Sequence, residues 1–364
     1  MITFFAALTL VAPQQVQPFT VPSADGYVLT GQADAPEGPS RGTVILVAGT
    51  GAFDRDVSFG RSGTPRDRLF ADLAARFTAR GLTAVRYDRR GIRHGVPRSE
   101  AIDAAAAPGV TPENLSADVA AIYDRVRSGD GPAAGCVVFF AHSEGAVHVA
   151  GVAEAGAPAP ALVIGMGAPL ESKASAVRWQ SVGRDADSLA MMDADADGTV
   201  TNDEVRANWM NTPSAVFETL DPFLHPNGAW TPADLEQLRA TQEAIYEQEK
   251  TTALTMGDAD PYPSAARPVF SGRWWKSWMI DDEPLAVRFA HWRSPMILHF
   301  GDLDSQVRED RQRAAAAGVL PAGQVRFVSH PGRGHSLGND TLLGPVDEAI
   351  AEQIADEAAA ACPD

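Results

Sequence analysis

Cysteine is scarce in this chain, and its scarcity excludes several architectures. The 364 residues include only two cysteines, Cys136 and Cys362. Two residues so far apart in sequence form neither a disulfide framework nor the CxxC pattern of a zinc site. Cys136 opens an apolar run, so we expect it simply to pack in the core.

Positive charge and long apolar runs are also in short supply. The chain has 30 basic and 47 acidic residues, a formal net charge of −17 and a pI near 4.8. Phosphate contacts need clustered Lys and Arg, so this balance argues against a nucleic acid or an anionic membrane as partner. No run approaches the ~20 apolar residues of a transmembrane helix, so no membrane span is expected. The sequence carries no signal for an oligomeric state.

The first fifteen residues resemble a signal peptide in part. Residues 2–12 form an apolar run about as long as the hydrophobic region of a secretory signal peptide. The small residues expected at a cleavage site end near Ala12. The usual positive start is missing, since no Lys or Arg precedes Arg41. The apolar run nevertheless favours a signal peptide over residues 1–15, which predicts a secreted or periplasmic protein. The alternative is a cytoplasmic protein that begins with a strand or an irregular segment.

Strands and helices alternate along most of the remaining chain. Extended runs flank the Asp25-Gly26 turn within residues 16–34, and apolar runs at 43–48, 82–87, 136–141 and 161–166 predict strands. Amphipathic helices are expected at 66–80, at 115–126 and from about 144. This alternation predicts an α/β fold with a mostly parallel, doubly wound sheet.

The alternation stops at about residue 171 and resumes at about residue 294. The intervening text is helical, acidic and rich in aromatic residues, whereas residues 295–300 and 324–328 again predict strands and 346–360 a final helix. We therefore expect a core formed by residues 16–170 and 294–364, with a mainly helical cap inserted over 171–293.

Ser143 is the candidate nucleophile. The segment VVFFAHSEGA places it between a predicted strand and a predicted helix, in a small-x-Ser-x-Gly pattern. This pattern is typical of a nucleophile elbow, in which small residues allow a tight, strained turn. The alternative interpretation is an ordinary serine that caps the helix.

A serine hydroxyl needs a base and an orienting acid, and both are present in the order Ser, acid, His. Asp304 follows the strand at 295–300, at the carboxyl end where sites in open sheets lie. His335 stands in the Gly-rich loop after the last strand, close enough in the fold to reach both. Asp302 is the rival acid and His330 the rival base.

Together these motifs resemble the α/β-hydrolases of the esterase and serine-aminopeptidase-like group. AHSEG matches the elbow, GDLDSQV the acid turn with Asp304 as its fourth residue, and GRGHSL the histidine loop. VAGTGAFDRD and VRYDRRG also resemble the oxyanion strand and the arginine-glycine turn of the group. The resemblance covers about residues 20–168 and 294–360. It implies an α/β-hydrolase fold with Ser143, Asp304 and His335 as the catalytic triad.

Acyl transfer also needs donors for the negative charge on the substrate oxygen. One should be the backbone N–H of Glu144, which follows the nucleophile. The other should come from Gly49-Thr50-Gly51, where the group has its oxyanion turn; we choose Thr50, with Gly51 close behind.

Residues 193–204, DADADGTVTNDE, fit the spacing of an EF-hand calcium loop. Positions 1, 3, 5, 7 and 12 are expected to supply metal ligands, position 6 is the glycine of the sharp bend, and Thr201 at position 9 would bind through water. No second such loop is visible. We therefore expect one structural Ca²⁺ in the cap and no cofactor for the chemistry; the alternative is an acidic surface loop that binds nothing. The expected ligands are Asp193, Asp195, Asp197, Thr199 and Glu204.

Aromatic residues crowd the predicted cap, and two roles are open for them. They could line an acyl pocket over Ser143, or they could form the core of the cap itself. The residues concerned are Trp209, Phe217, Phe223, Trp230, Tyr246, Tyr262, Phe270, Trp274, Trp275 and Trp278.

The sequence thus favours a carboxylic ester hydrolase that acts through an acyl-enzyme on a small-molecule ester. A peptidase or amidase with the same triad is the first alternative. The second is a non-catalytic calcium-binding protein on a hydrolase fold, against which the intact Ser143, Asp304 and His335 argue.

Overall fold

The computed structural model describes residues 15–58, 63–97, 99–129, 135–216, 218–338 and 344–363. The predicted signal peptide lies outside these residues, except for residue 15, which begins the first strand. Within the described residues, no helix is long and apolar enough to cross a membrane.

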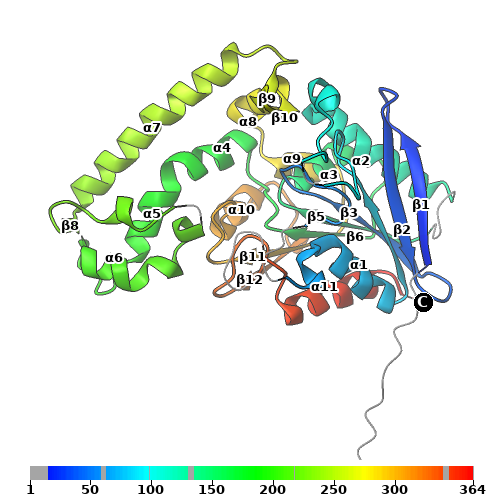
Figure 1. The fold of residues 1–364 in the computed structure, drawn as a ribbon. Helices are drawn as coiled ribbons and strands as arrows, with labels where there is room; N and C mark the ends of the chain where they lie inside the picture. The colour runs from blue at the N-terminus through cyan, green and yellow to red at the C-terminus, as the bar shows by residue number, and fades with distance from the viewer. Residues whose placement is uncertain are drawn as a thin grey trace, which may run out of the picture.

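An eight-stranded sheet forms the centre of the molecule, in the order β1-β2-β4-β3-β5-β6-β11-β12 (Figure 1). β1 and β2 form an antiparallel hairpin, β2 pairs antiparallel with β4, and all remaining pairs are parallel. The sheet confirms the mostly parallel architecture predicted from the sequence. Its strands are β1 (Gln15–Pro22), β2 (Val28–Ala35), β3 (Gly42–Val47), β4 (Leu82–Tyr87), β5 (Val137–His142), β6 (Leu162–Met166), β11 (Met296–Gly301) and β12 (Val325–His330).

Helices cover both faces of this sheet. Successive side chains of a strand point to opposite faces, and in the fully buried β3 Val44 and Leu46 enter one core while Ile45 and Val47 enter the other. The first core is closed by α1 and α11, and the second by α2, α3 and α9. This two-sided burial explains why the central strands are continuously apolar. The helices are α1 (Leu69–Ala79), α2 (Pro112–Arg127), α3 (Gly145–Glu154), α9 (Leu285–Phe289), α10 (Glu309–Ala316) and α11 (Glu348–Ala361).

Between β6 and β11 the chain leaves the sheet and builds a mainly helical insertion, which extends away from the sheet in Figure 1. Two short antiparallel pairs, β7 with β8 and β9 with β10, were not predicted. The elements are α4 (Lys173–Arg178), the π-helical η3 (Trp179–Gly183), α5 (Arg184–Met191), β7 (Val200–Thr201), α6 (Asn202–Asn208), three 3-10 turns at 209–211, 213–216 and 221–223, β8 (Ala229–Trp230), α7 (Pro232–Thr255), β9 (Pro261–Ser264), β10 (Arg267–Ser271) and α8 (Gly272–Ile280).

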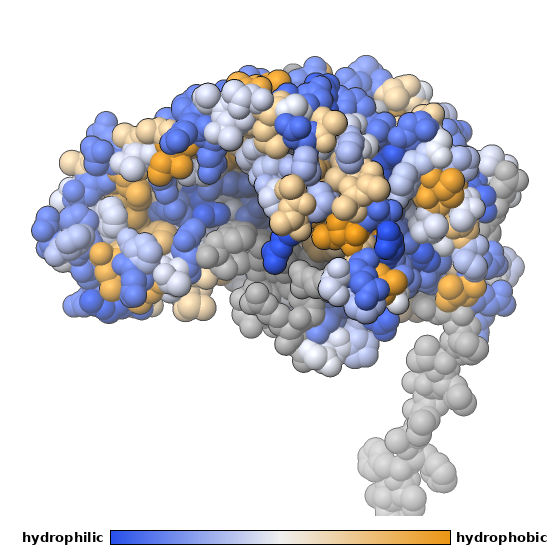
Figure 2. Space-filling model, turned by 45° about the horizontal axis from the view of Figure 1, so that its top comes forward, coloured by the Kyte–Doolittle hydropathy of each residue, from blue (hydrophilic) through white to orange (hydrophobic). Residues whose placement is uncertain are grey.

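The outer part of this insertion has a small hydrophobic core of its own. Leu189, Val205, Trp209 and Phe223 are buried there together with neighbouring apolar residues. The view in Figure 2 is mainly hydrophilic, with hydrophobic residues scattered in small groups. Because the small core is separate from the two cores beside the sheet, the outer part of the insertion is packed independently of them.

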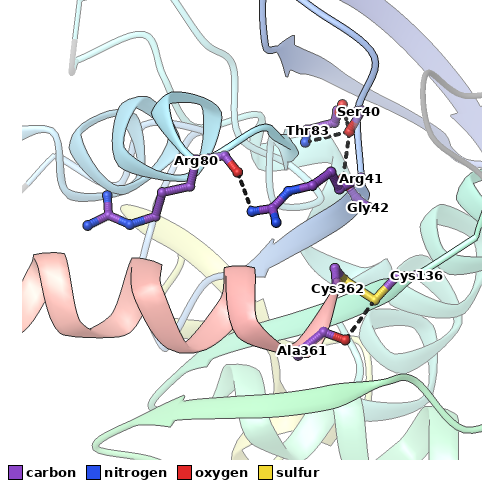
Figure 3. Close-up of a disulfide and its surroundings, with 8 residues drawn as sticks. All are labelled: Ser40, Arg41, Gly42, Arg80, Thr83, Cys136, Ala361 and Cys362. Atoms are coloured by element: carbon purple, nitrogen blue, oxygen red, sulfur yellow. Dashed lines mark hydrogen bonds between the residues drawn. A yellow bond between two sulfur atoms is a disulfide. The ribbon is translucent and has the colours of Figure 1, made fainter. Parts of the chain in front are cut away.

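The expectation that Cys136 merely packs was wrong, because Cys136 and Cys362 form a disulfide (Figure 3). The two Cα atoms are 5.6 Å apart although 226 residues separate them in sequence. Cys136 directly precedes β5. Cys362 directly follows α11, the helix that packs on the sheet face to which Val44 and Leu46 point. A Cβ at Gly42 would lie 2.6 Å from Sγ of Cys362, so the glycine leaves room for the bridge. Sequence spacing could not reveal a pairing that the packing of α11 creates.

Replacing Cys362 with serine is expected to lower the free energy of unfolding by about 2–4 kcal/mol, because the bridge restricts the unfolded chain over a long loop. Denaturant unfolding with and without a reductant measures the effect. The reductant should destabilise the parent protein and leave the Cys362→Ser variant unchanged. Equal midpoints for parent and variant would contradict a stabilising bridge.

Candidate active site

Ser143 occupies a strained turn between β5 and α3. Its backbone φ is +53°, a left-handed value that is unusual for a residue other than glycine. Its N–H donates to the Met166 carbonyl at the end of β6 (2.9 Å), and its side chain is partly exposed. No side-chain cap bond is formed at the start of α3, which begins after Glu144. The geometry is therefore that of an elbow and not of a serine cap.

Two glycines allow the backbone to approach this turn closely. A Cβ at Gly145 would collide with the Val47 carbonyl oxygen of β3. A Cβ at Gly49, in the loop after β3, would lie 2.8 Å from Cβ of Ser143. The small residues of both motifs are thus explained by the contact between the elbow and the loop.

Asp304 and His335 form a hydrogen-bonded pair. Nδ1 of His335 lies 2.8 Å from Oδ2 and 3.0 Å from Oδ1 of Asp304, and both side chains are almost completely buried. Oδ1 of Asp304 also accepts the backbone N–H groups of Gln306 (2.7 Å) and Val307 (3.0 Å). The carboxylate is thus fixed in its loop, and it holds the ring through Nδ1, so Nε2 is the nitrogen left for a proton transfer.

Gly167 is a site residue that the sequence analysis missed. It follows β6, adopts a φ of +55°, and a Cβ there would lie 2.6 Å from both Nδ1 and Cε1 of His335. The same Cβ would lie 3.2 Å from Oδ2 of Asp304. Any side chain at this position would displace the histidine-aspartate pair, but a single glycine after a strand gives no warning of such a contact.

The rival acid and base lie elsewhere. Asp302 is exposed and accepts the N–H of Gly332 at 2.7 Å. Nε2 of His330 lies 3.0 Å from Nδ1 of His299, whose Nε2 lies 2.8 Å from Glu357 on α11. Burial and the neighbouring His299 lower the pKa of His330 to about 4. Among the described residues, neither Asp302 nor His330 forms a hydrogen bond with His335.

The two predicted oxyanion donors come from different segments of the chain. Thr50 is exposed in the loop after β3, and Glu144 directly follows Ser143. Among the described residues, neither backbone N–H has a hydrogen-bond acceptor. Both residues line the same pocket as Ser143, whereas Gly51, the alternative to Thr50, does not.

The Glu144 side chain is buried below the elbow. Arg89, in the loop after β4, donates to Oε2 (2.9 Å), and the indole of Trp274 on α8 donates to Oε1 (2.5 Å). Burial by itself would raise the pKa of this carboxyl, but the Arg89 charge and the neighbouring His148 outweigh it and hold the pKa below its ordinary value. Glu144 is therefore a structural anion and not a proton donor.

A pocket of about 450 Å³ opens at the nucleophile. Its wall combines the predicted triad serine and histidine with the aromatic part of the insertion, and Glu144 is its one carboxylate among the described residues. The lining residues are Thr50, Phe53, His142, Ser143, Glu144, Pro169, Ala176, Val177, Gln180, Tyr262, Pro263, Phe270, Trp274, Trp275, Trp278, Gln306, Val307 and His335.

The aromatic residues of the insertion divide between the two roles that the sequence left open. Tyr262, Phe270, Trp274, Trp275 and Trp278 line the pocket. Trp209, Phe223 and Trp230 belong to the small core of the outer insertion. Tyr246 is buried in the core that α2, α3 and α9 close, and Phe217 lies outside the described residues.

The acidic loop 193–204 joins α5 to α6. Carboxylate oxygens of Asp193, Asp195 and Asp197 lie within 4.8 Å of one another, and Gly198 has a φ of +85°. Two oxygens bound to one Ca²⁺ at 2.3–2.6 Å can be at most about 5 Å apart, so the three carboxylates fit such an ion. Glu204 lies outside this group: its carboxylate accepts the N–H groups of Ala194 (3.0 Å) and Thr201 (2.8 Å).

A second loop, similar to the first from its glycine onward, packs beside it. β7 pairs antiparallel with β8, so that Val200 lies opposite Trp230. Gly198 lies two residues before Val200 and Gly228 two residues before Trp230, and both glycines have a positive φ. Each strand is followed by a capping box, Thr201 with Glu204 and Thr231 with Asp234.

The second loop lacks the acidic residues of the first. The positions that correspond to the three aspartates are Phe223, His225 and Asn227. An EF-hand pattern is recognised by its acidic positions, so this loop could not be found in that way. The shared spacing Gly-x-x-Thr-x-x-acid, repeated thirty residues apart, was the signal that could have found it.

Similarity to known proteins is found among solved structures. No family model matches the chain, and no curated protein matches it. Among solved structures, it is similar to a highly thermostable carboxyl esterase from Bacillus coagulans in complex with glycerol, with 14% identity, 96% of this chain and 98% of that chain covered, and a TM-score of 0.54. It is also similar to DcsB in complex with its substrate analogue, with 14% identity, coverage of 96% and 100%, and a TM-score of 0.50.

At such low identity these similarities establish the fold and nothing finer. The chain has the α/β-hydrolase fold that the sequence motifs predicted, with a mainly helical insertion between β6 and β11. The chemistry of the site is a separate question.

Proposed function

We propose that the protein is a serine hydrolase that cleaves carboxylic esters through an acyl-enzyme. The observation that carries this proposal is the Asp304–His335 hydrogen bond beside a strained Ser143 elbow, with Ser143 and His335 lining one pocket. Their arrangement is suited to nucleophilic acyl transfer.

In the proposed mechanism, Ser143 Oγ attacks the ester carbonyl while Nε2 of His335 accepts its proton. Asp304 accepts the Nδ1–H and stabilises the imidazolium that forms. The backbone N–H groups of Thr50 and Glu144 receive the developing oxyanion. His335 returns the proton to the leaving alcohol, and water then hydrolyses the acyl-enzyme by the same steps.

The pocket favours an ester over the amino-terminal amide of a peptide. A free carboxylate is the strongest partner for a substrate ammonium group, but Glu144 is already bound by Arg89 and Trp274. The rest of the described lining is aromatic, aliphatic or uncharged apart from the two histidines. An uncharged acyl or alcohol group fits these walls better.

A panel of substrates tests this proposal. p-Nitrophenyl esters of increasing acyl length are compared with aminoacyl p-nitroanilides, and a serine-directed fluorophosphonate is used to label the protein before peptide mass spectrometry. We expect turnover of the esters, little turnover of the anilides, and label on Ser143. Faster turnover of the anilides would favour the peptidase alternative. An inactive protein without label would favour the non-catalytic alternative.

For the acidic loop, the proposal is a structural Ca²⁺ held by Asp193, Asp195 and Asp197, with the Thr199 carbonyl and Glu204. The three clustered carboxylates support it, and the second loop would brace the first through the β7–β8 pair. Glu204 would have to turn from its capping bonds toward the ion. The loop lies in the insertion, so the ion would stabilise the fold and supply nothing to the chemistry.

Chelation is accordingly expected to lower the melting temperature more than it lowers ester hydrolysis at mild temperature. Binding to the folded state alone stabilises it by about 2.7 kcal/mol at a hundredfold excess over Kd. Melting curves with EGTA and with added Ca²⁺ measure this, and Mg²⁺ should substitute poorly.

The Glu204→Gln variant should lose most of this response. Asp234→Asn is its matched control, because Asp234 caps α7 as Glu204 caps α6 but belongs to the loop without aspartates. The control should respond to Ca²⁺ like the parent. Superimposable parent curves with and without EGTA would refute the calcium site.

The disulfide bears on where the protein folds. Bridges of this kind persist in oxidising compartments and are rare in the cytosol. Together with the apolar start of the chain, it supports secretion or a periplasmic location. Thiol alkylation of protein taken directly from cells should leave both cysteines unmodified, and two modified cysteines would favour a cytoplasmic location.

A further inference from the structure

Arg89 is a buried cation that touches both sides of the active-site turn. It lies in the loop after β4, and only 6% of its surface is exposed. One nitrogen, Nη1, donates to the Gly49 carbonyl (2.6 Å) and also to Oε2 of Glu144 (2.9 Å). The guanidinium lies 5.1 Å from the centre of the Phe270 ring. A single group thus joins the loop after β3 to the elbow.

The bond to Gly49 controls the direction of a different group. In a planar trans peptide, the carbonyl of one residue and the N–H of the next point in opposite directions. Arg89 holds the Gly49 carbonyl toward the interior, so the Thr50 N–H of the same peptide unit is directed away from Arg89. Thr50 lines the pocket and its N–H has no acceptor among the described residues.

The bond to Glu144 acts on the other predicted donor. Glu144 supplies its backbone N–H beside Ser143, and its carboxylate is anchored below by Arg89 and by Trp274 (2.5 Å). Its lowered pKa keeps the carboxylate charged and hence bound to the guanidinium. The buried ion pair therefore fixes a residue that lines the pocket next to Ser143.

We propose that Arg89 is a positioning residue that aims the N–H groups of Thr50 and Glu144 at the same point above Ser143. The proposal rests on the hydrolase function proposed above and extends it to a residue that does not touch the substrate. Preorganised donors matter because they do not have to reorient as the oxyanion develops. Loss of Arg89 should therefore weaken binding of the transition state and leave binding of the ester almost unchanged.

The test compares Arg89→Met, Arg89→Lys and the parent on one p-nitrophenyl ester. Loss of one oxyanion donor costs about 10²–10³ in kcat where it has been measured, so a misaimed pair should lower kcat by about 10- to 100-fold in Arg89→Met, with KM within about threefold. Arg89→Lys, whose single ammonium can still donate to both oxygens, should recover part of the loss. The affinity for an alkyl boronic acid, which forms a tetrahedral anion on serine, should fall by a factor similar to that of kcat.

Arg90→Met is the matched control. Arg90 is the adjacent buried arginine, and its guanidinium binds Asp118 and Asp25, which belong neither to the elbow nor to the loop after β3. It should lose melting temperature as Arg89→Met does, with kcat and boronic acid affinity within about threefold of the parent. Equal losses of kcat in the two variants would mean a general packing effect and would overturn the proposal.

Other outcomes are equally decisive. If Arg89→Met does not fold, Arg89→Lys and Glu144→Gln carry the test, and unchanged kcat and boronic acid affinity in both would overturn the role of Arg89. Normal kcat in a folded Arg89→Met would do the same. An inactive parent, or activity that does not depend on Ser143, would instead refute the proposed hydrolase function itself.

Discussion

Replacement of Ser143 by alanine is expected to lower ester hydrolysis by about 10⁴- to 10⁶-fold, because no acyl-enzyme can form without its hydroxyl. The strained elbow should persist, since its φ of +53° is set by the surrounding strands and glycines and not by the serine side chain. The melting temperature should therefore change little. Initial rates on a p-nitrophenyl ester, together with a melting curve, measure both effects.

Ser172→Ala is the control for this variant. Ser172 is an ordinary helix cap whose side chain accepts the N–H of Ser175 at the start of α4 (3.1 Å). Its loss should cost about 1 kcal/mol of stability and leave the rate near that of the parent. If Ser143→Ala behaved like Ser172→Ala, losing stability but not rate, then the Ser143 hydroxyl would not be the nucleophile and the hydrolase proposal would fail.

The second large effect is expected for Asp304→Asn, which should lower kcat by about 10⁴-fold. The asparagine fits the same space, but its NH₂ group would face Nδ1 of His335 or leave the ring in the wrong tautomer. Asp302→Asn is the natural comparison, since Asp302 is two residues away and its side chain accepts the N–H of Gly332, outside the Asp304–His335 pair. It should retain the parent rate within a few-fold.

Kinetics at several pH values and a melting curve for each variant measure this difference. Asp304 also accepts two backbone N–H groups, so Asp304→Asn is expected to lose some stability as well. The decisive quantity is the rate of the folded protein. A larger loss of rate in Asp302→Asn would reverse the assignment of the acid.

The sheet and its order of motifs could be predicted because their signals are local. The apolar runs that became β3 and β5 are buried on both faces, and such strands show in sequence as continuous hydrophobic segments. Ser143, Asp304 and His335 each follow a predicted strand, so their approach at one edge of the sheet follows from the fold. The structure brings Asp304 and His335 into contact and places His335 and Ser143 at one pocket.

What escaped prediction depends on contacts between segments far apart in the chain. Gly167 matters because His335, from a loop 168 residues later in the sequence, packs against it. The Cys136–Cys362 bridge depends on how α11 packs on the sheet. The role proposed for Arg89 depends on the loop after β3 and the elbow, which meet only in the folded protein. The second loop of the insertion escaped because its ligand positions are not acidic, although its glycine and its strand match those of the first.

The disulfide also makes a covalent ring of most of the chain. Ser143, Asp304, His335 and the whole insertion lie between Cys136 and Cys362, whereas Thr50 and Arg89 lie outside the ring. A protease that cuts once anywhere in the insertion would open the backbone without releasing a fragment, so the nick would become visible on a gel only after reduction. Because the strand of the nucleophile and the loops of Asp304 and His335 stay on one molecule after such a cut, a cleaved insertion could change access to the pocket while the triad remains tethered.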